Sequence, residues 1–247
     1  MINVLLGSVL ILALVDAVQA AELQVIAGGG IADPLNEIAA LFERASGHKV
    51  VIRYGAAPEL IKMAKSGVPF DLGVVREDVW KDTAARAQVA PGPTPDVARV
   101  GIGVAVRAGA PRGDISTAEA LKQTLLKAQS IASIPASASG AQLAGIYELL
   151  GIANEMKAKT KAQLAPKQIV EAVANGDAEL AVFGLNVLVD PRLDIVGPFP
   201  AEVQREVVYA VGIAATSKEP EAAKAFVAYL MSPPAIAVIK AKGMNPG

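Results

Sequence analysis

The sequence predicts an α/β protein built on largely parallel β-structure, and two observations support this. From Leu23 onward, short apolar runs alternate with amphipathic helical patterns. The repeated unit is a strand, a short loop and a helix, which is typical of sheets covered by helices. The chain has 247 residues, of which 53% are hydrophobic and 19% charged, so it can form one domain or two small ones with an ample core.

The first elements are expected from apolar runs and from residues that mark helix ends. Asp33 is expected to cap the first helix, with Pro34 at its first position and Gly47 beyond its end. Pro58 opens the next helix and Gly67 closes it. Together, the patterns predict strands at 23–27, 50–54 and 70–76 and helices at 34–46, 58–66 and 77–88.

A second set of elements follows a proline-rich connector at 90–95. Ser116 and Glu119 have the spacing of a capping box at the start of a helix. We expect strands at 100–107, 131–135, 179–184 and 207–215, and helices at 117–128, 141–150, 166–174, 221–231 and 235–242. A loop is expected at 137–140, and a coil that contains 190–191 and 197–200 is expected after the strand at 179–184. The long runs at 100–107 and 207–215 predict two crossings between lobes, with the middle of the chain forming an inserted second lobe and the last segment returning to the first.

Residues 1–20 are interpreted as a cleaved secretory leader. The stretch from Val4 to Val15 is apolar, and Val18-Gln19-Ala20 presents small groups at the positions that a signal peptidase reads. The alternative is a membrane anchor, but Asp16 ends the run short of the roughly 18 apolar residues that a span needs. Since the chain has no cysteine for lipid attachment, we expect a protein free in the periplasm.

The composition excludes several classes of function. With no cysteine and one histidine, the chain has no thiol nucleophile, and transition metals would find neither soft nor multiple imidazole donors. The net charge of −1 and the absence of a Lys/Arg block give no electrostatic footprint for nucleic acid. His48 is interpreted as a solvated residue of a helix-exit turn. We therefore expect no cofactor and no metal, and a small molecule as the partner.

Three loops that follow strands and precede helices are the candidate binding elements, at 28–32, 55–58 and 137–141. In open α/β sheets ligands bind beyond the carboxyl ends of strands, where free N–H groups at helix starts attract anions. Each helix terminus offers about 0.3–1 kcal/mol to a negative charge. The alternative for any single loop is simple turn chemistry. A dinucleotide fingerprint fails, because Asp33 stands where the third glycine belongs.

Arg76 is the candidate cation, because it ends an apolar strand just before a helix. A guanidinium there could pair a ligand carboxylate bidentately. The alternative is a surface arginine paired with Glu77 or Asp78. Arg107 is a weaker candidate on the expected crossing strand. Tyr54 and Phe183 are interpreted as core or pocket wall, and Trp80 as a packing residue.

Several segments of the chain resemble the type II periplasmic solute-binding proteins of ABC importers, in the branch of the molybdate-binding proteins. They are 23–30, 66–72, 196–204, 219–226 and 242–244, and the resemblance covers nearly the whole mature chain. It implies a two-lobed fold in which each lobe is a mixed sheet flanked by helices. The expected lobes are 21–103 with 208–247, and 104–207.

The resemblance also implies where a ligand binds and what it is. Molybdate-binding proteins hold their oxyanion with backbone N–H groups, with serine hydroxyls in the first two loops and with a tyrosine of the second lobe. Gly30, Ala57 and Phe183 stand at those positions here, so these side-chain hydroxyls are missing. Each charge-assisted hydrogen bond lost costs roughly 1.5–3 kcal/mol. A small organic carboxylate is therefore favoured, and a molybdate-like oxyanion stays open.

The function implied is that of a monomeric periplasmic protein that closes around a small anionic solute by a hinge motion and delivers it to an ABC permease. A related branch is similar to an aconitate isomerase, so the alternative is an exported isomerase of a small tricarboxylate. Glu59 could serve such chemistry as a base, but no residue is assigned as catalytic. The expected ligand contacts are Gly29, Gly30, Ile31, Ala56, Ala57 and Arg76 in the first lobe, and Ser137, Ala138, Ser139, Phe183 and Gly184 in the second.

Overall fold

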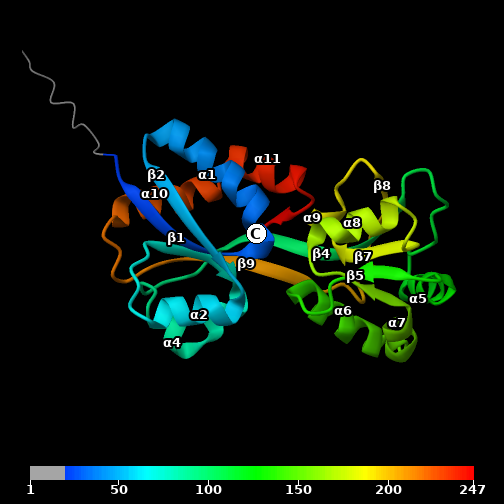
Figure 1. Cartoon of the computed structure of the whole chain (residues 1–247). Helices are drawn as coiled ribbons and strands as arrows, with labels where there is room; N and C mark the ends of the chain where they lie inside the picture. Colours follow the sequence, from blue (N-terminus) through cyan, green and yellow to red (C-terminus); the bar gives the residue numbers. More distant parts are fainter. Residues whose placement is uncertain (1–19) are drawn as a thin grey trace, which may run out of the picture.

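The computed structural model describes residues 20–247, whose strands form a ten-stranded mixed sheet that extends through two halves of the molecule (Figure 1). The strand order along the sheet is β2-β1-β3-β9-β4-β7-β5-β6, and β8 and β10 also pair with β4. Helices cover both faces of each half. This arrangement confirms the predicted α/β class. The expected leader lies outside the described residues except for Ala20.

The first half contains both ends of the described part of the chain, residues 20–247. Its strands β1, β2 and β3 are parallel, with Gly28 of β1 opposite Gly55 of β2. The loops that follow these strands therefore emerge at one edge of the sheet. The elements are β1 (Glu22–Gly28), the 3₁₀ turn η1 (Gly29–Ile31), α1 (Ala32–Ser46), β2 (Lys49–Gly55), α2 (Ala57–Lys65), β3 (Leu72–Arg76), α3 (Glu77–Lys81), α4 (Thr83–Arg86), β9 (Glu206–Ile213), α10 (Pro220–Leu230), α11 (Pro233–Ala241) and β10 (Asn245–Pro246).

The second half is formed by the middle of the chain. In Figure 1, α8 and α9 lie on one side of its strands and α6 and α7 on the other. Its elements are α5 (Ala118–Lys127), β5 (Ile131–Ser133), α6 (Ala138–Leu149), α7 (Ala153–Lys159), β6 (Thr160–Ala162), α8 (Pro166–Ala174), β7 (Leu180–Gly184), α9 (Leu185–Leu188) and β8 (Leu193–Pro198).

Strand β4 (Asp96–Arg107) belongs to both halves. Its residues up to Gly101 pair with β9, and from Ile102 onward it pairs with β7 and, from Gly103, with β8. The chain returns just before β9, where the Gln204 side chain accepts a hydrogen bond from the Ile102 N–H and donates one to the Ile102 carbonyl, both at 2.9 Å. The expectation that 207–215 is itself a crossing is wrong, because β9 pairs only with strands of the first half and with the first part of β4.

The hydrophobic core is divided in the same way. One cluster of buried side chains runs from Ile102 to Val203 and fills the second half. Two further clusters fill the first half, one on each side of its sheet, and draw on residues before 101 and after 206. Phe226, Leu35 and Leu121 are among the largest fully buried side chains. Each half therefore has a core of its own, and β4 connects them.

Four local expectations near helix ends are wrong. The single helix at 77–88 is broken at Asp82, whose extended backbone ends α3 and whose carboxylate caps α4. Helix α1 begins at Ala32, one residue before its expected cap. Thr117, and not Ser116, caps α5, and α6 begins at Ala138 inside the expected loop. The sequence patterns also missed α7, β6, β8, α9 and β10.

His48 is buried and does not lie in a solvated turn. It is 7% exposed, its Nδ1 accepts a hydrogen bond of 3.0 Å from the Ala21 N–H, and its ring stacks on Phe42. The histidine thus ties the start of β1 to the end of α1.

Among residues 20–247, no single helix is both long enough and apolar enough to span a membrane. Helices α10 and α11 reach this length and hydropathy only as a pair, which is bent by 57° at the break between them.

A buried carboxylate attaches the segment that leads into α10 to the strands of the first half. Asp71, which is 5% exposed, accepts hydrogen bonds from the Gln24 N–H at 2.8 Å, the Ser217 hydroxyl at 2.8 Å and the Lys218 N–H at 3.1 Å. It therefore joins β1, β3 and the segment that leads into α10.

Replacing Asp71 with alanine is expected to lower the free energy of unfolding by about 3 kcal/mol, because three part-buried donors lose the charged acceptor that they share. Urea denaturation measures this change. The control Asp177→Ala, at an exposed position, should change stability by no more than about 0.5 kcal/mol. A loss below about 1 kcal/mol for Asp71→Ala would show that water replaces the acceptor.

Candidate ligand site at the junction of the halves

The first half contributes three adjacent chain segments at one edge of its sheet. Turn η1 follows β1, the first residues of α2 follow β2, and Arg76 ends β3. Gly29 and Gly30 are exposed, whereas the Ile31 side chain is buried in the core. Ala56 precedes the first turn of α2, and its N–H donates to the Glu59 carboxylate at 3.0 Å.

The second half contributes the start of α6 and the end of β7. The Ser137 hydroxyl is occupied by structural bonds, since it caps the Gly140 N–H at 3.0 Å and donates to the Ile134 carbonyl at 2.7 Å. The Ser139 hydroxyl has no such bond, and it faces Gly184, where an added Cβ would lie 3.3 Å from it. Of the two expected hydroxyls, Ser139 is the one available to a ligand.

The two halves touch at this point. The Asn186 side chain at the start of α9 donates a 3.2 Å hydrogen bond to the Gly30 carbonyl of η1. Ala138 of α6 packs against the core of the first half. The turn after β1 and the helix starts of the second half are therefore neighbours, although they are far apart in the sequence.

Tyr209 of β9 lies against the same turn. Its side chain is 5% exposed, and its ring fills the space beside Gly28 and Gly30. An added Cβ at Gly30 would lie 2.2 Å from the Tyr209 hydroxyl. Burial raises the pKa of Tyr209 to about 12, with Arg76 lowering it and Asp78 raising it by smaller amounts. The phenol is therefore neutral at physiological pH and keeps its proton to donate.

Arg76 stands opposite Tyr209 in the pairing of β3 with β9. Its Nε donates to the Asp78 carboxylate at 2.9 Å, and its Nη2 donates to the second oxygen of that carboxylate. This is the surface pairing that the sequence left as an alternative. Because a guanidinium has five N–H donors, the Asp78 pair leaves donors on Nη1 and Nη2 for another acceptor.

We call six of these residues the junction site. Gly30, Arg76 and Tyr209 come from the first half, and Ser139, Gly184 and Asn186 come from the second. Tyr209 and Asn186 were missed by sequence analysis. The only feature of the sequence that could have indicated them is their position. Tyr209 stands among the aliphatic residues of a strand, and Asn186 closely follows the end of β7.

Other residues that the sequence singled out have different roles. Phe183 is 5% exposed and packs in the core of the second half. Trp80 is a core residue whose Nε1 donates to the Ala210 carbonyl at 3.3 Å. Tyr54 donates to Asn36 at 2.8 Å, and burial raises its pKa to about 12. Arg107 is exposed at the end of β4. None of the contacts described above joins Ala57 to the second half.

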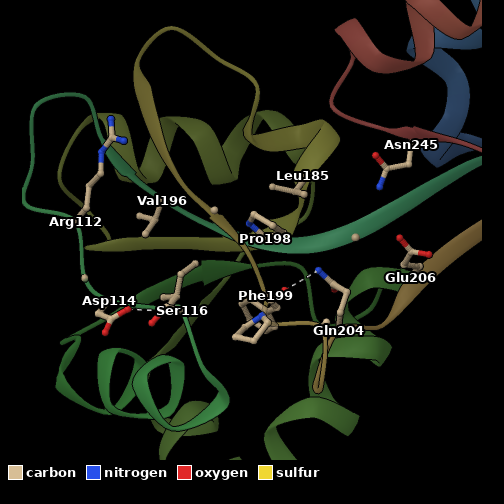
Figure 2. A pocket seen from close by; sticks show the side chains of 16 residues that line it. Arg112, Asp114, Ser116, Leu185, Val196, Pro198, Phe199, Gln204, Glu206 and Asn245 are labelled. Carbon is tan, nitrogen blue, oxygen red and sulfur yellow. Dashed lines mark hydrogen bonds between the residues drawn. The ribbon is translucent and has the colours of Figure 1, made fainter.

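A separate groove of about 740 Å³ contains none of the expected contacts (Figure 2). Asp114 and Ser116 lie on one side of it, and Glu206 and Asn245 on the other. Its cation, Arg112, already pairs with Asp194 at 3.3 Å. With two carboxylates and one paired arginine, the groove is poorly suited to an anion. The junction site has the better chemistry for one, because it offers neutral donors beside Arg76.

In the part of the chain that the structure describes, no three His, Asp or Glu side chains gather in a way that would hold a metal ion.

The two halves, each with its own core and joined by β4, define a two-lobed periplasmic binding protein. Residues 23–245 match the family of bacterial extracellular solute-binding proteins, and the chain belongs to this family. Within it, the chain is a type II protein of the branch that includes the molybdate-binding proteins. The resemblance inferred from sequence is confirmed.

The relatives of this chain include both an isomerase and a binding protein. An aconitate isomerase from Pseudomonas sp. is 36% identical over 233 residues, covering 91% of this chain and 87% of the relative. The molybdate-binding protein ModA of Azotobacter vinelandii is 29% identical over 237 residues, covering 92% and 91%. Among solved structures, the periplasmic molybdate-binding protein of Azotobacter vinelandii has a TM-score of 0.67 at 21% identity and covers 91% of this chain and 99% of its own. That likeness shows the fold.

Adding a methyl group at Gly30 is expected to destabilise the protein by about 1–3 kcal/mol, because the new Cβ must displace the Tyr209 ring. Gly29→Ala is the matched control, since nothing lies within 4 Å of its added Cβ, and its effect should stay within about 0.5 kcal/mol. Urea denaturation compares the two.

The double variant Gly30→Ala/Tyr209→Phe tests the cause, because removing the hydroxyl relieves the clash. It should recover much of the loss caused by Gly30→Ala. Equal stability of Gly30→Ala and Gly29→Ala would refute the contact.

Proposed function

We propose that the protein binds a small organic carboxylate at the junction site and delivers it to the permease of an ABC importer. The proposed lobes, 21–103 with 208–247 and 104–207, close on the ligand as a monomer in the periplasm after removal of residues 1–20. The hinge is the place where β4 passes from one half to the other. The observation that carries the proposal is the meeting of Gly30, Arg76 and Tyr209 with Ser139 and Asn186 at one junction.

The charge balance of the junction site supports a monovalent anionic group as the part of the ligand that is recognised there. Arg76 is a positive charge that is already shared with Asp78. The remaining contacts are neutral hydroxyl, amide and peptide groups, which suit a planar carboxylate that accepts several hydrogen bonds. A compact dianion would need more donors in the first two loops, where Gly30 and Ala57 have no side-chain hydroxyl.

Contacts from both halves also supply a mechanism for closure. A ligand that touches η1 and Arg76 on one side and Ser139 on the other stabilises the arrangement in which these groups are close. The Asn186 bond to the Gly30 carbonyl spans the same interface, so it strengthens the closed form. The proposed ligand contacts remain Gly29, Gly30, Ile31, Ala56, Ala57, Arg76, Ser137, Ala138, Ser139, Phe183 and Gly184, with Ile31 and Ser137 contributing through their peptide groups.

A thermal-shift panel of di- and tricarboxylates, amino acids, molybdate and tungstate is expected to identify carboxylates as ligands. A ligand at a hundred times its dissociation constant adds about 2.7 kcal/mol of stability. Molybdate should give no comparable shift. Stabilisation by molybdate or tungstate alone would contradict the proposal.

Arg76→Ala is expected to raise the dissociation constant of that carboxylate more than tenfold, or about 1.4 kcal/mol, because the ligand loses its charged partner. Isothermal titration calorimetry measures it. Arg107→Ala is the matched control, since it removes an exposed arginine at the far end of β4. An unchanged dissociation constant for Arg76→Ala would restrict Arg76 to its pair with Asp78.

The second candidate function is isomerisation of a small tricarboxylate at the same site. It is favoured by the 36% identity to the aconitate isomerase from Pseudomonas sp.. Incubation with cis- or trans-aconitate, followed by proton NMR, separates the two functions. A binding protein leaves the isomer ratio unchanged. Interconversion that disappears in Arg76→Ala would assign an isomerase.

A further inference from the structure

A buried tyrosine in the middle of an aliphatic strand calls for a physical reason. Tyr209 alternates with Val207 and Val211 on the face of β9 that packs into the core of the first half. Phenylalanine would fill the same space without a polar group. The Tyr209 hydroxyl makes no hydrogen bond with another of residues 20–247. It is not one of the fully buried side-chain atoms that lack a partner in that part of the chain, so its oxygen is accessible although the residue as a whole is only 5% exposed.

The hydroxyl is directed at the turn that follows β1. The added Cβ at Gly30 would lie 2.2 Å from this oxygen, and the added Cβ at Gly28 would lie 3.0 Å from the ring. At Gly29, between them, an added Cβ meets nothing within 4 Å. Gly28 at the end of β1 and Gly30 in the turn therefore leave room for the phenol. The hydroxyl occupies the place that a side chain at residue 30 would otherwise take.

Arg76 lies beside the phenol, because it is directly opposite Tyr209 in the pairing of β3 with β9. Residues directly opposite in an antiparallel pair have Cβ atoms about 4.5–5.5 Å apart on the same face, and Arg76 and Tyr209 are such a pair. The guanidinium is held by Asp78 through Nε and Nη2. Its Nη1 is directed away from that pair by the planar geometry of the group.

We propose that the Tyr209 hydroxyl is a specificity-determining donor of the junction site and donates a hydrogen bond to the ligand carboxylate that Arg76 pairs. This rests on the proposed function and names the group that recognises the carboxylate. The hydroxyl supplies, from β9, the side-chain donor that Gly30 lacks. A carboxylate can accept from the phenol and the guanidinium together because it has two oxygens with about four acceptor sites.

The neutral state of the phenol suits this role. With a pKa raised to about 12 by burial, Tyr209 remains a donor throughout the physiological range and adds no negative charge beside an anionic ligand.

The test is Tyr209→Phe, which removes one oxygen and keeps the ring. Wild type and variant are titrated calorimetrically with citrate, cis-aconitate and trans-aconitate. The variant is expected to bind the preferred carboxylate at least tenfold more weakly. Urea denaturation of both unliganded proteins accompanies the titrations and shows whether the variant folds as stably as wild type.

Tyr147→Phe is the matched control. Tyr147 is also a buried tyrosine, 8% exposed, whose hydroxyl has no hydrogen-bond partner, but it lies in the core of the second half. This variant should bind the same ligand within twofold of wild type.

The outcomes separate this inference from the proposed function. If wild type binds a carboxylate that Arg76→Ala weakens, while Tyr209→Phe binds it within twofold of wild type, the role of Tyr209 is overturned and the proposed function stands. If wild type binds none of the carboxylates, both are overturned. An equal loss of affinity in Tyr209→Phe and Tyr147→Phe would also overturn the inference, because it would reflect a general effect of removing a tyrosine hydroxyl.

Discussion

The continuity of β4 is the constraint on which the rest of this structure depends. Its first residues are hydrogen-bonded into one half and its last residues into the other, so the halves cannot separate and can only change their mutual angle. Gln204 binds both backbone groups of Ile102 at the point of transition. The turn that follows β1 consequently lies against the start of α9, and the start of α6 packs on the core of the first half. A short strand segment thus places chemically useful groups from distant parts of the chain at one junction.

The chemistry of that junction is sparse and largely neutral. Arg76 is neutralised in part by Asp78, and the groups around it are a phenol, a serine hydroxyl, an amide and peptide N–H groups. Such a set recognises an anion through directional hydrogen bonds more than through net charge. The chain as a whole carries a charge of −1, so long-range attraction contributes little. The recognition must therefore be local, and it depends on how closely the halves approach each other.

Most of the fold could be predicted from sequence because its elements are marked by local signals. Helix α8 begins and ends where Pro166 and the apolar spacing indicated, and Gly47 ends α1 with the expected left-handed backbone. The predictions from sequence are wrong where a contact with a distant residue, or a competing helix cap, determines the local structure. His48 looked like a loop residue but bonds to Ala21, and the helix at 77–88 breaks because Asp82 prefers to cap α4. Of the site, the loops were predictable from strand ends, whereas Tyr209 and Asn186 were not, since only the folded chain brings them to Gly30.

A crystal structure of the protein with its bound carboxylate tests the account most directly. It should show the ligand between the two halves. One carboxylate of the ligand should lie near Arg76 and the Tyr209 hydroxyl, and Ser139 should contact the ligand from the second half. Ligand density in the groove lined by Asp114 and Glu206, or contacts to one half alone, would contradict it.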